Sequence, residues 1–540
     1  MHGITIPSAT AEKSAKRGRR RGLRVGLPVA GPVILAVALA GPAVAAPAGY
    51  GLARPAVSRN QVGPSAPAPG SSPTVYVADF GSDTVTPIST ATNTAGPPIT
   101  VGNSPYNLAI TPDGKTVYVG DGNSTDTITP ISTATNTAGS AIPAGGGVNG
   151  IVAAPDGKTV YAADFYSGTA TGISTATNTA GPSVPVGDGP MDLAFTPDSK
   201  TVYVVNSFSG NVTPITVATN TPGPPIPVGD FPVGIAITPD GKTVYVSNDD
   251  SGTVTPITAA TNTAGPPISV GPGPQTIAIT PDGKTAYVAN EGGDTVTPIT
   301  VATNTPGSPI TVGQQPGDMV ISPDGKTLYV ANISSDTVTP ITIATNTPGP
   351  AIPIGSQAWQ IAITPDGTTA YVSNRGSNSV TPINLATNTA EPAIPVGPDP
   401  HGLVITPAPA PAAPTGPIVS GYQPSKCVST KNGSDADGAP VVIADCDGKA
   451  AQQWVVETGG AIEHDGKCLN VDGTGKARST PVDLGACTGA AAQRWAADKG
   501  ALVNTASGKC MNDPAFDVTP GTQLEIFTCT GGTNQKWTLP

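Results

Sequence analysis

Short runs of apolar and β-branched residues alternate with turn residues along most of the chain, and the arrangement returns about every 42 residues. In the first copy the strand signals lie at residues 76–78, 84–88, 99–101 and 107–111. Val, Ile, Thr and Tyr dominate these runs, while Gly, Pro, Asn and Asp separate them. Each copy therefore predicts four short antiparallel strands, with Pro87 on an outer or irregular strand because proline cannot donate to a central ladder.

A recurrent Pro-Asp turn and a recurrent tyrosine strand set the number of copies. The turn aspartates are Asp113, Asp156, Asp198, Asp240, Asp282, Asp324 and Asp366, and the strand tyrosines are Tyr76, Tyr118, Tyr161, Tyr203, Tyr245, Tyr287, Tyr329 and Tyr371. Four-stranded units repeated radially form a β-propeller. The pattern predicts an all-β fold with an eight-bladed propeller over residues 74–407. The lone strand at residues 401–406 is expected to complete the first blade and close the ring.

The segments outside the repeats have their own composition. Residues 1–45 hold a basic cluster, a short apolar run and the small-residue site Ala43-Val44-Ala45, which together predict a secretory signal peptide. Residues 46–73 are rich in Pro, Ala and Gly and predict a disordered lead. Residues 408–417 predict a Pro/Ala linker. We expect a secreted protein without a membrane span, either released or retained at the cell surface, with the export route left open.

Composition and charge limit the classes of partner that the chain is expected to bind. The chain has 66 Gly, 61 Pro and 12% charged residues, which fits many short strands joined by turns. Removing the signal peptide takes away seven basic residues and one acidic residue, so the formal charge falls from −11 to −17. So acidic a chain is not expected to bind nucleic acid. The start of a calcium loop at Asp121, Asn123 and Thr125 lacks the distal glutamate, so we predict neither a metal nor a cofactor.

The last quarter of the chain follows a second repeat. Its six cysteines fall in pairs 19 residues apart, which in an exported protein predicts the disulfides Cys427–Cys446, Cys468–Cys487 and Cys510–Cys529. A Gln-x-Trp motif closes each unit, at Trp454, Trp495 and Trp537. Three such β units predict a β-trefoil over residues 418–540. The tryptophans are expected in its core.

Both repeats resemble known families. The propeller units resemble the YVTN family through Tyr-Val-Ser-Asn at residues 245–248, Tyr-Val-Ala-Asn at residues 287–290 and the Pro-Asp-Gly-Lys turns. Members of that family are often seven-bladed and occur in exported or cell-surface proteins. The Cys and Gln-x-Trp spacing of residues 418–540 resembles the ricin B-type lectins, also called carbohydrate-binding module family 13. This second resemblance implies glycan binding.

The lectin resemblance also implies site residues. In such a lobe, sugar is bound by an acidic residue two after the first Cys, an aromatic residue two before the second Cys, and an Asn-Gln pair. The third lobe offers Asn512, Asp513, Phe527, Asn534 and Gln535. The second lobe offers Asn470 but has Gly485 and Ala492 in place of the aromatic residue and the asparagine. The first lobe is expected to be structural.

The propeller copies can be compared with one another. The Pro-Asp-Gly-Lys and Ala-Thr-Asn-Thr turns hardly vary and look like scaffold, whereas the other two connections vary and should emerge together on the opposite face. Candidate recognition residues on that face are Tyr106, Asp192, Asp318, Trp359 and His401. Drift in exposed loops explains the variation equally well.

These patterns favour a secreted, non-catalytic carbohydrate-binding protein whose third lobe binds glycan. The propeller would be a scaffold with a second interaction face, toward a cell-wall component or a protein. One alternative is a secreted polysaccharide-cleaving enzyme that uses Asp192, Asp318 or Glu291 as acid and base. Another is a structural cell-surface propeller. The sugar's identity and the oligomeric state stay open.

Overall fold

A computed structural model describes residues 72–540 except 123–126, 408–413, 458–459 and 472–476. The predicted signal peptide, nearly all of the predicted lead, Asn123 and residues 408–413 of the predicted linker lie outside the described residues. The described residues contain strands and single turns of 3-10 helix, and no helix among them could cross a membrane. The 3-10 turns are η1 (Val217–Thr219), η2 (Glu291–Gly293), η3 (Lys431–Gly433), η4 (Ala450–Gln452), η5 (Ala491–Gln493), η6 (Pro514–Phe516) and η7 (Thr533–Gln535).

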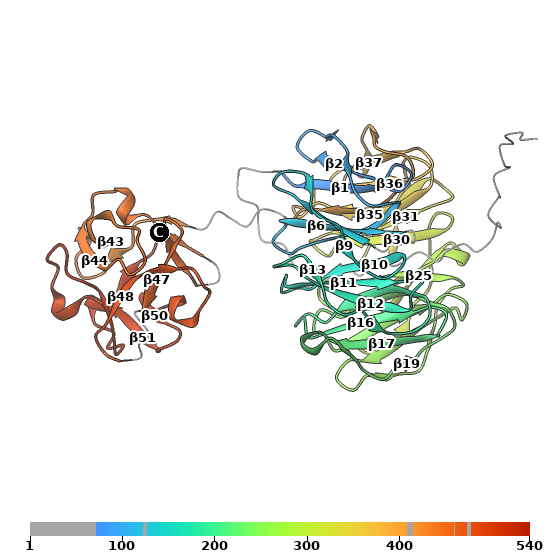
Figure 1. Ribbon diagram of the computed structural model, residues 1–540. Coiled ribbons are helices and arrows are strands. Elements are labelled where there is room, and N and C mark those ends of the chain that lie inside the picture. Colours follow the sequence, from blue (N-terminus) through green and yellow to red (C-terminus); the bar gives the residue numbers. More distant parts are fainter. Residues whose placement is uncertain (1–71, 123–126, 408–413, 458–459, 472–476) are drawn as a thin grey trace, which may run out of the picture. The chain divides into compact units, whose positions relative to one another are not determined.

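Eight sheets with the same topology follow one another between residues 74 and 405, coloured blue to yellow in Figure 1. Each sheet has an inner strand, a second strand, a third strand and an outer position. The inner strands are β40 (Pro400–Ile405), β5 (Pro105–Ile110), β10 (Val148–Ala153), β15 (Pro190–Phe195), β20 (Pro232–Ile237), β25 (Pro274–Ile279), β30 (Pro316–Ile321) and β35 (Ala358–Ile363). The second strands are β1 (Thr74–Asp79), β6 (Thr116–Asp121), β11 (Thr159–Asp164), β16 (Thr201–Asn206), β21 (Thr243–Asn248), β26 (Thr285–Asn290), β31 (Thr327–Asn332) and β36 (Thr369–Asn374).

The third strands and the outer positions complete each sheet. The third strands are β2 (Thr84–Ser89), β7 (Thr127–Ser132), β12 (Thr169–Ser174), β17 (Asn211–Thr216), β22 (Thr253–Thr258), β27 (Thr295–Thr300), β32 (Thr337–Thr342) and β37 (Ser379–Asn384). The outer positions are pairs of two-residue strands: β3 (Thr94–Ala95) with β4 (Ile99–Thr100), β8 (Thr137–Ala138) with β9 (Ile142–Pro143), β13 (Thr179–Ala180) with β14 (Val184–Pro185), β18 (Thr221–Pro222) with β19 (Ile226–Pro227), β23 (Thr263–Ala264) with β24 (Ile268–Ser269), β28 (Thr305–Pro306) with β29 (Ile310–Thr311), β33 (Thr347–Pro348) with β34 (Ile352–Pro353), and β38 (Thr389–Ala390) with β39 (Ile394–Pro395).

Pro87 lies on the third strand and not on the outermost one, and the split outer position makes the pairing of this strand irregular, which is the second of the two alternatives expected for it. β3 pairs with Ile88 and Ser89 of β2, and β4 pairs with Thr84 and Val85. Pro87 therefore faces the gap between β3 and β4, where no outer strand needs a backbone donor. Its carbonyl accepts a hydrogen bond from Gly96 N at 2.8 Å.

The ring closes through its last strand, as the phase of the repeat predicts. β40 pairs antiparallel with β1, with Val75 opposite Ile405 and Val77 opposite Leu403. Neighbouring inner strands contact one another all the way round, including β35 with β40 and β40 with β5. Apolar side chains of adjacent sheets pack together, as in the cluster of Val75, Tyr371 and Leu403 between the last sheet and the first. The pairing leaves β1 without a free edge.

The C-terminal unit, residues 415–540, is orange to red in Figure 1 and consists of short strands around one core. Its strands are β41 (Thr415–Gly416), β42 (Val419–Ser420), β43 (Lys426–Thr430), β44 (Val441–Asp445), β45 (Trp454–Val456), β46 (Ile462–His464), β47 (Lys467–Val471), β48 (Thr480–Ala486), β49 (Trp495–Asp498), β50 (Ala501–Asn504), β51 (Lys509–Asn512), β52 (Glu525–Phe527) and β53 (Trp537–Thr538). All three predicted disulfides are present, with Cα–Cα distances of 5.0–5.1 Å. β41 lies inside the predicted linker and pairs with β45, so this unit begins earlier than residue 418.

The three tryptophans of this unit lie in its core, as expected. Trp454, Trp495 and Trp537 are buried together with Leu469, Met511 and other apolar residues. Each indole N–H donates to the carbonyl of the residue after the first cysteine of its own lobe, at 2.9–3.0 Å. The repeated Trp thus anchors each lobe internally, because a buried indole N–H needs an acceptor.

Candidate functional site

The two variable connections of the propeller meet on one face, as predicted. In every sheet a backbone N–H just after the second strand donates to a carbonyl just before the inner strand. Examples are Phe80 N to Asp399 O at 3.1 Å and Phe165 N to Gly147 O at 2.9 Å. We call this surface the variable face. Its loops are tied to one another, so their side chains are presented from a fixed backbone.

The conserved turns meet at the opposite ends of the strands. In the first copy Asp113 Oδ1 accepts hydrogen bonds from Thr111 Oγ1 at 2.6 Å and from Lys115 N at 3.1 Å. Thr133, which directly precedes the following Ala-Thr-Asn-Thr turn, donates its hydroxyl to Gly114 O at 2.6 Å. The aspartate therefore completes an Asx turn, which is the scaffold role expected for it.

Three of the predicted propeller candidates come together on the variable face. The rings of Tyr106 and Trp359 lie 4.8 and 5.0 Å from the ring of His401, and Phe80 stacks on the same imidazole at 4.8 Å. His401 and Tyr106 are buried. These residues come from the first, second and last sheets, so the cluster exists only because β40 closes the ring.

Charged side chains flank this aromatic cluster. The Arg375 guanidinium lies 4.4 Å over the Trp359 ring, and its Nε donates to Asp399 Oδ1 at 2.7 Å. His401 Nε2 lies 3.3 Å from the same carboxylate oxygen. Hydrogen bonds from His401 and Arg375 hold the pKa of Asp399 well below its usual range even though partial burial opposes them. Arg375 and Asp399 thus fix the rings in place.

Asp192 and Asp318 do not join that cluster, and both are buried. Asp192 Oδ1 accepts from Leu193 N at 2.8 Å, and its Oδ2 accepts from Ile235 N, in the next inner strand, at 3.3 Å. Asp318 accepts from Met319 N at 2.9 Å and from Ile361 N at 3.0 Å. Both carboxylates therefore join adjacent inner strands, which is a structural use that the sequence interpretation missed.

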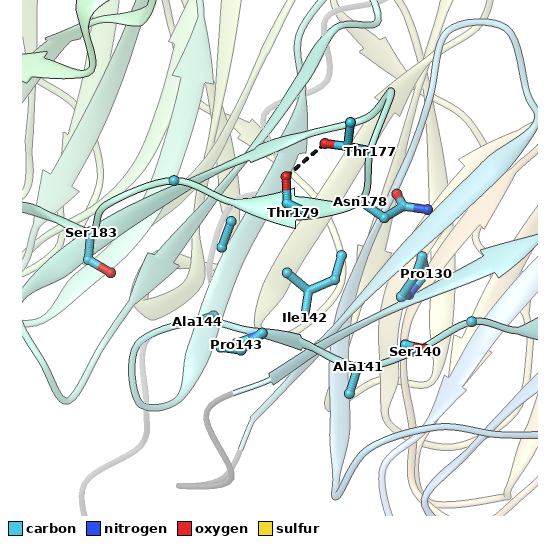
Figure 2. Close-up of a pocket in the computed structure, with 13 residues that line it drawn as sticks. Pro130, Ser140, Ala141, Ile142, Pro143, Ala144, Thr177, Asn178, Thr179 and Ser183 are labelled. Carbon is cyan, nitrogen blue, oxygen red and sulfur yellow. Dashed lines mark hydrogen bonds between the residues drawn. The ribbon is translucent and has the colours of Figure 1, made fainter.

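A groove of 690 Å³ lies between the outer strands of two neighbouring sheets, at β9 and β13 (Figure 2). Ser140 and Ala141 line it where the first copy carries Pro97 and Pro98. Figure 2 shows Thr177 and Thr179, across the groove from Ser140 and Ala141, hydrogen-bonded to each other; the two hydroxyl oxygens lie 2.7 Å apart. Its lining contains no charged residue. The groove is thus a gap left by two missing prolines.

Strand pairing in the third lobe of the C-terminal unit places three polar and aromatic side chains on one surface. Asn512 lies opposite Glu525 across β51 and β52, and Cys510 lies opposite Phe527. Side chains alternate along a strand, and the intervening Met511 and Ile526 point into the core. The side chains of Asn512, Glu525 and Phe527 therefore lie on the side of the strand pair that faces away from the core. Glu525 was not among the predicted site residues.

The predicted amide residues of this lobe form a hydrogen-bond chain behind that surface. Asn534 Nδ2 and Gln535 Nε2 donate to Asn512 Oδ1 at 2.9 and 3.1 Å. Asn512 Nδ2 in turn donates to Glu525 Oε1 at 3.1 Å. Asn512, Asn534 and Gln535 are buried, whereas Glu525 and Phe527 are partly exposed. The amides therefore orient the Glu525 carboxylate, and Glu525 and Phe527 form the accessible part of the site.

Gln535 has a structural role that recurs in every lobe. Its Oε1 accepts from Thr530 N at 2.8 Å, just as Gln493 Oε1 accepts from Thr488 N and Gln452 Oε1 accepts from Asp447 N. The glutamine of each Gln-x-Trp motif thus holds the loop after the second cysteine. Because the same contact occurs in all three lobes, this glutamine is a feature of the fold.

Asp513 does not lie on the surface, which corrects the expectation that it stands beside Asn512 as an acidic ligand. It is fully buried, and neither of its carboxylate oxygens has a hydrogen-bond partner among the described residues. Burial, and to a smaller degree the nearby Asp517, raise the pKa of Asp513 to about 6. A glycan cannot reach this carboxylate without movement of the loop.

The second lobe keeps the pair of polar residues but lacks the ring. Asn470 Nδ2 donates to Asp483 Oδ1 at 2.9 Å, in the position of Asn512 and Glu525. Gly485 stands where the third lobe has Phe527, so this position offers no ring to a sugar. In the first lobe Ser429 lies opposite Val442, and the polar pair is absent.

One group of potential metal ligands occurs among the described residues. Glu463, Cys468 and Cys487 bring ligand atoms within 4.8 Å of one another. The two cysteines form a disulfide, and a disulfide sulfur is not the thiolate that binds metals. This group therefore does not form a metal centre.

Two family models match parts of the chain. Residues 414–537 match the ricin-type beta-trefoil lectin domain, which supports carbohydrate binding by the C-terminal unit. Residues 259–351 match a lactonase family described as a 7-bladed beta-propeller, whereas the structure has eight sheets. No curated protein matches the chain.

The propeller-like fold is shared with a solved structure, and two further matches have TM-scores below 0.5. Dihydro-heme d1 dehydrogenase NirN in complex with DHE has 15% identity and a TM-score of 0.55, over 65% of this chain and 79% of that one. Hydrazine synthase from Kuenenia stuttgartiensis (22% identity, TM-score 0.45) is matched over 52% of this chain and 96% of that one. A functionally unknown protein from Desulfotomaculum acetoxidans DSM 771 (19%, 0.45) is matched over 62% and 98%. The chain thus has propeller-like sheets followed by a segment, residues 414–537, that matches a ricin-type beta-trefoil lectin domain.

Proposed function

We propose that this protein is an exported, non-catalytic carbohydrate-binding protein whose third trefoil lobe binds glycan. The observation that carries the proposal is the surface formed by Glu525 and Phe527 inside the segment that matches the lectin domain. An exposed ring packs on the apolar face of a sugar, and a carboxylate accepts hydrogen bonds from adjacent hydroxyls. The chain Gln535 to Asn512 to Glu525 holds that carboxylate in one orientation.

The propeller serves in this proposal as an eight-bladed scaffold that presents a second interaction surface. The eight sheets and the pairing of β40 with β1 support that blade number. The resemblance to YVTN repeats stays a prediction. Two tethered binding surfaces on one chain would add avidity to a shallow lectin lobe. An experimental structure with seven blades would contradict the blade count.

Catalysis is not part of the proposal, because the carboxylates of Asp192 and Asp318 accept hydrogen bonds from backbone N–H groups of adjacent strands. Release of soluble sugars from polysaccharide by the full chain, abolished in Asp318→Asn, would favour a hydrolase instead. Export is tested by recovering the protein from culture medium with a new N-terminus after residue 45.

Glycan binding is tested with the full chain on a glycan array and on insoluble polysaccharides. We expect Phe527→Ala to weaken binding by at least about tenfold, the usual effect of removing a central aromatic contact. Glu525→Gln should weaken it less, because the amide keeps the hydrogen bond from Asn512 and loses only the charge.

Phe516→Ala is the matched control, because Phe516 is an exposed ring of the same lobe that packs against Tyr422. This variant should bind as the unchanged protein does. Absence of glycan binding by the full chain, or equal loss in both phenylalanine variants, contradicts the proposal.

A further inference from the structure

Four aromatic rings form a continuous ladder on the variable face, across three neighbouring sheets. Tyr166 contacts Phe165 at 5.3 Å between ring centres, Phe165 contacts Phe208 at 5.4 Å, and Phe208 contacts Phe231 at 5.9 Å. Tyr166 and Phe208 are 65% and 62% exposed, the highest values among the large apolar side chains described. Phe165 and Phe231 rest partly buried on Met191 and Val233. The rings thus form one apolar patch with a packed base.

The backbone holds the two exposed rings, Tyr166 and Phe208, in position. Tyr166 N donates to Gly146 O at 2.9 Å, and Phe208 N donates to Asp188 O at 3.1 Å. Gly147 and Gly189 lie directly against these rings, and a Cβ at either position would come within 2.4–2.7 Å of a ring carbon. Glycine therefore makes room for each ring. Exposed rings fixed in this way keep apolar surface in water, which is a feature of interaction sites.

Acidic residues border the ladder. Asp188 is joined through its backbone to Phe208, Asp230 precedes Phe231, and Asp249 N donates to Phe231 O at 3.0 Å. Asp249 lies beside Asp250 and Glu291: burial first, then these two neighbours, raise the pKa of Asp249 to about 6. A group of carboxylates thus lies directly beside the aromatic patch.

The lysines of the propeller lie on the face opposite the variable face. Among the described residues of the propeller, every lysine belongs to a Pro-Asp-Gly-Lys or Pro-Asp-Ser-Lys turn and pairs with the aspartate of that turn. The arginine on the variable face, Arg375, is bound by Asp399. The variable face therefore offers apolar surface and negative charge together.

We propose that this aromatic–acidic strip, formed by Phe165, Tyr166, Phe208 and Phe231 with Asp188, Asp230, Asp249 and Asp250, docks a protein segment that carries apolar side chains beside lysine or arginine. The proposal rests on the second interaction surface of the proposed function and names its partner. Charge complementarity selects a cationic partner. Neighbouring rings are tilted by 47–87° to one another, so they form ridges that accept side chains and not a flat platform for sugars.

The test is selection of a phage-displayed random peptide library on the full chain, followed by fluorescence anisotropy with the enriched peptides. We expect the peptides to combine aromatic or aliphatic residues with lysine or arginine. Phe208→Ala should weaken their binding by at least about tenfold, because exposed aromatic anchors dominate such contacts. Asp249→Asn with Asp250→Asn should weaken binding in low salt, and the effect should shrink as salt screens the charges.

Phe527→Ala is the control that separates this surface from the lectin lobe: it should leave peptide binding unchanged, just as Phe208→Ala should leave glycan retention unchanged. Enrichment of acidic peptides, enrichment that survives Phe208→Ala, or no enrichment overturns the proposal. Binding of glucosamine oligomers to the strip in place of peptides, lost in Phe208→Ala, also overturns it and assigns the surface to a cationic glycan.

Discussion

One residue position divides the propeller copies into two chemical classes. The second strand ends in asparagine in five sheets but in aspartate, at Asp79, Asp121 and Asp164, in the first three. Asn206 donates from Nδ2 to Thr213 Oγ1 at 2.9 Å, whereas Asp79 accepts from Thr86 Oγ1 at 2.6 Å, and all of these end positions are fully buried. Burial, partly offset by hydrogen bonds from Thr86, Thr84 and Gly397, raises the pKa of Asp79 to about 6. The first three sheets therefore have an ionisable carboxyl where the other five have an amide, with no additional hydrogen bond in return.

Asp79→Asn is therefore expected to stabilise the protein at neutral pH. The pKa of Asp79 is raised to about 6 in the folded state, whereas the unfolded chain keeps the ordinary value of 3.8. The carboxyl is therefore neutral in both states below about pH 4, and as pH rises through about 6 its ionisation destabilises the folded state. The shift corresponds to roughly 3 kcal/mol, so we expect a gain of about 1–3 kcal/mol in the free energy of unfolding at pH 7 and almost none at pH 4. Denaturant titrations at the two pH values measure it.

Asn248→Asp is the reverse experiment, at the same position of a sheet that has asparagine. It should destabilise the protein at pH 7 and leave it nearly unchanged at pH 4. Equal effects of either substitution at both pH values would show that the charge is not the cause.

The candidate site shows what sequence reasoning can recover at this scale. Phe527 was predicted from its spacing to Cys529, and the structure leaves it partly exposed. Glu525 was missed because its role depends on facing Asn512 across a strand pair, which a spacing motif does not record. Asp513 was included because it is acidic and adjacent, but it follows the last residue of β51 in an extended conformation, in which neighbouring side chains point in opposite directions.

At the level of elements, a tyrosine on each second strand joins neighbouring sheets. Its hydroxyl donates, at 2.5–2.9 Å, to an asparagine in the Ala-Thr-Asn-Thr turn of the next sheet. The pairs are Tyr76 with Asn136, Tyr118 with Asn178, Tyr161 with Asn220, Tyr203 with Asn262, Tyr245 with Asn304, Tyr287 with Asn346, Tyr329 with Asn388 and Tyr371 with Asn93. Each of these asparagines has a positive φ of 51–53°, a conformation that asparagine tolerates well.

Tyr245→Phe should lower the free energy of unfolding by about 1 kcal/mol, the usual net value of one hydrogen bond when the acceptor left behind can reach water. Tyr371→Phe should cost the same, because Tyr371 bonds to Asn93 across the closure of the ring. Chemical denaturation of both variants measures this. A cost at Tyr245 with none at Tyr371 would show that the ring is open in solution.

The strands themselves were largely predictable, since alternation and turn residues place three of the four positions within two residues of their observed ends. The split outer position was not, because the Gly-Pro-Pro segment at residues 96–98 separates β3 from β4 and the apolar pattern registers only β4. Pro87 lies on the strand whose outer pairing is broken at this segment, which is the irregular strand that the sequence predicted for it. A proline is accepted next to a central strand when its outer neighbour is broken at that point.

At the scale of the whole molecule, the two units are stabilised in different ways. The propeller has no cysteine and depends on packing between adjacent sheets and on the closing strand β40. The C-terminal unit has one core cluster and three disulfides, all of them local. Three of the four tryptophans, Trp454, Trp495 and Trp537, also lie in this second core. The sequence already separated the units by their cysteines.

Reduction should therefore unfold the C-terminal unit selectively. Each disulfide closes a loop of 19 residues and contributes roughly 3 kcal/mol by restricting the unfolded chain, so losing all three removes most of the stability of a domain this small. Calorimetry with and without reductant should show one thermal transition lost or strongly lowered and the propeller transition unchanged. Tryptophan fluorescence should follow the sensitive transition, and glycan retention should disappear with it while peptide docking on the aromatic–acidic strip persists. A parallel shift of both transitions would instead mean that the two units unfold as one cooperative structure.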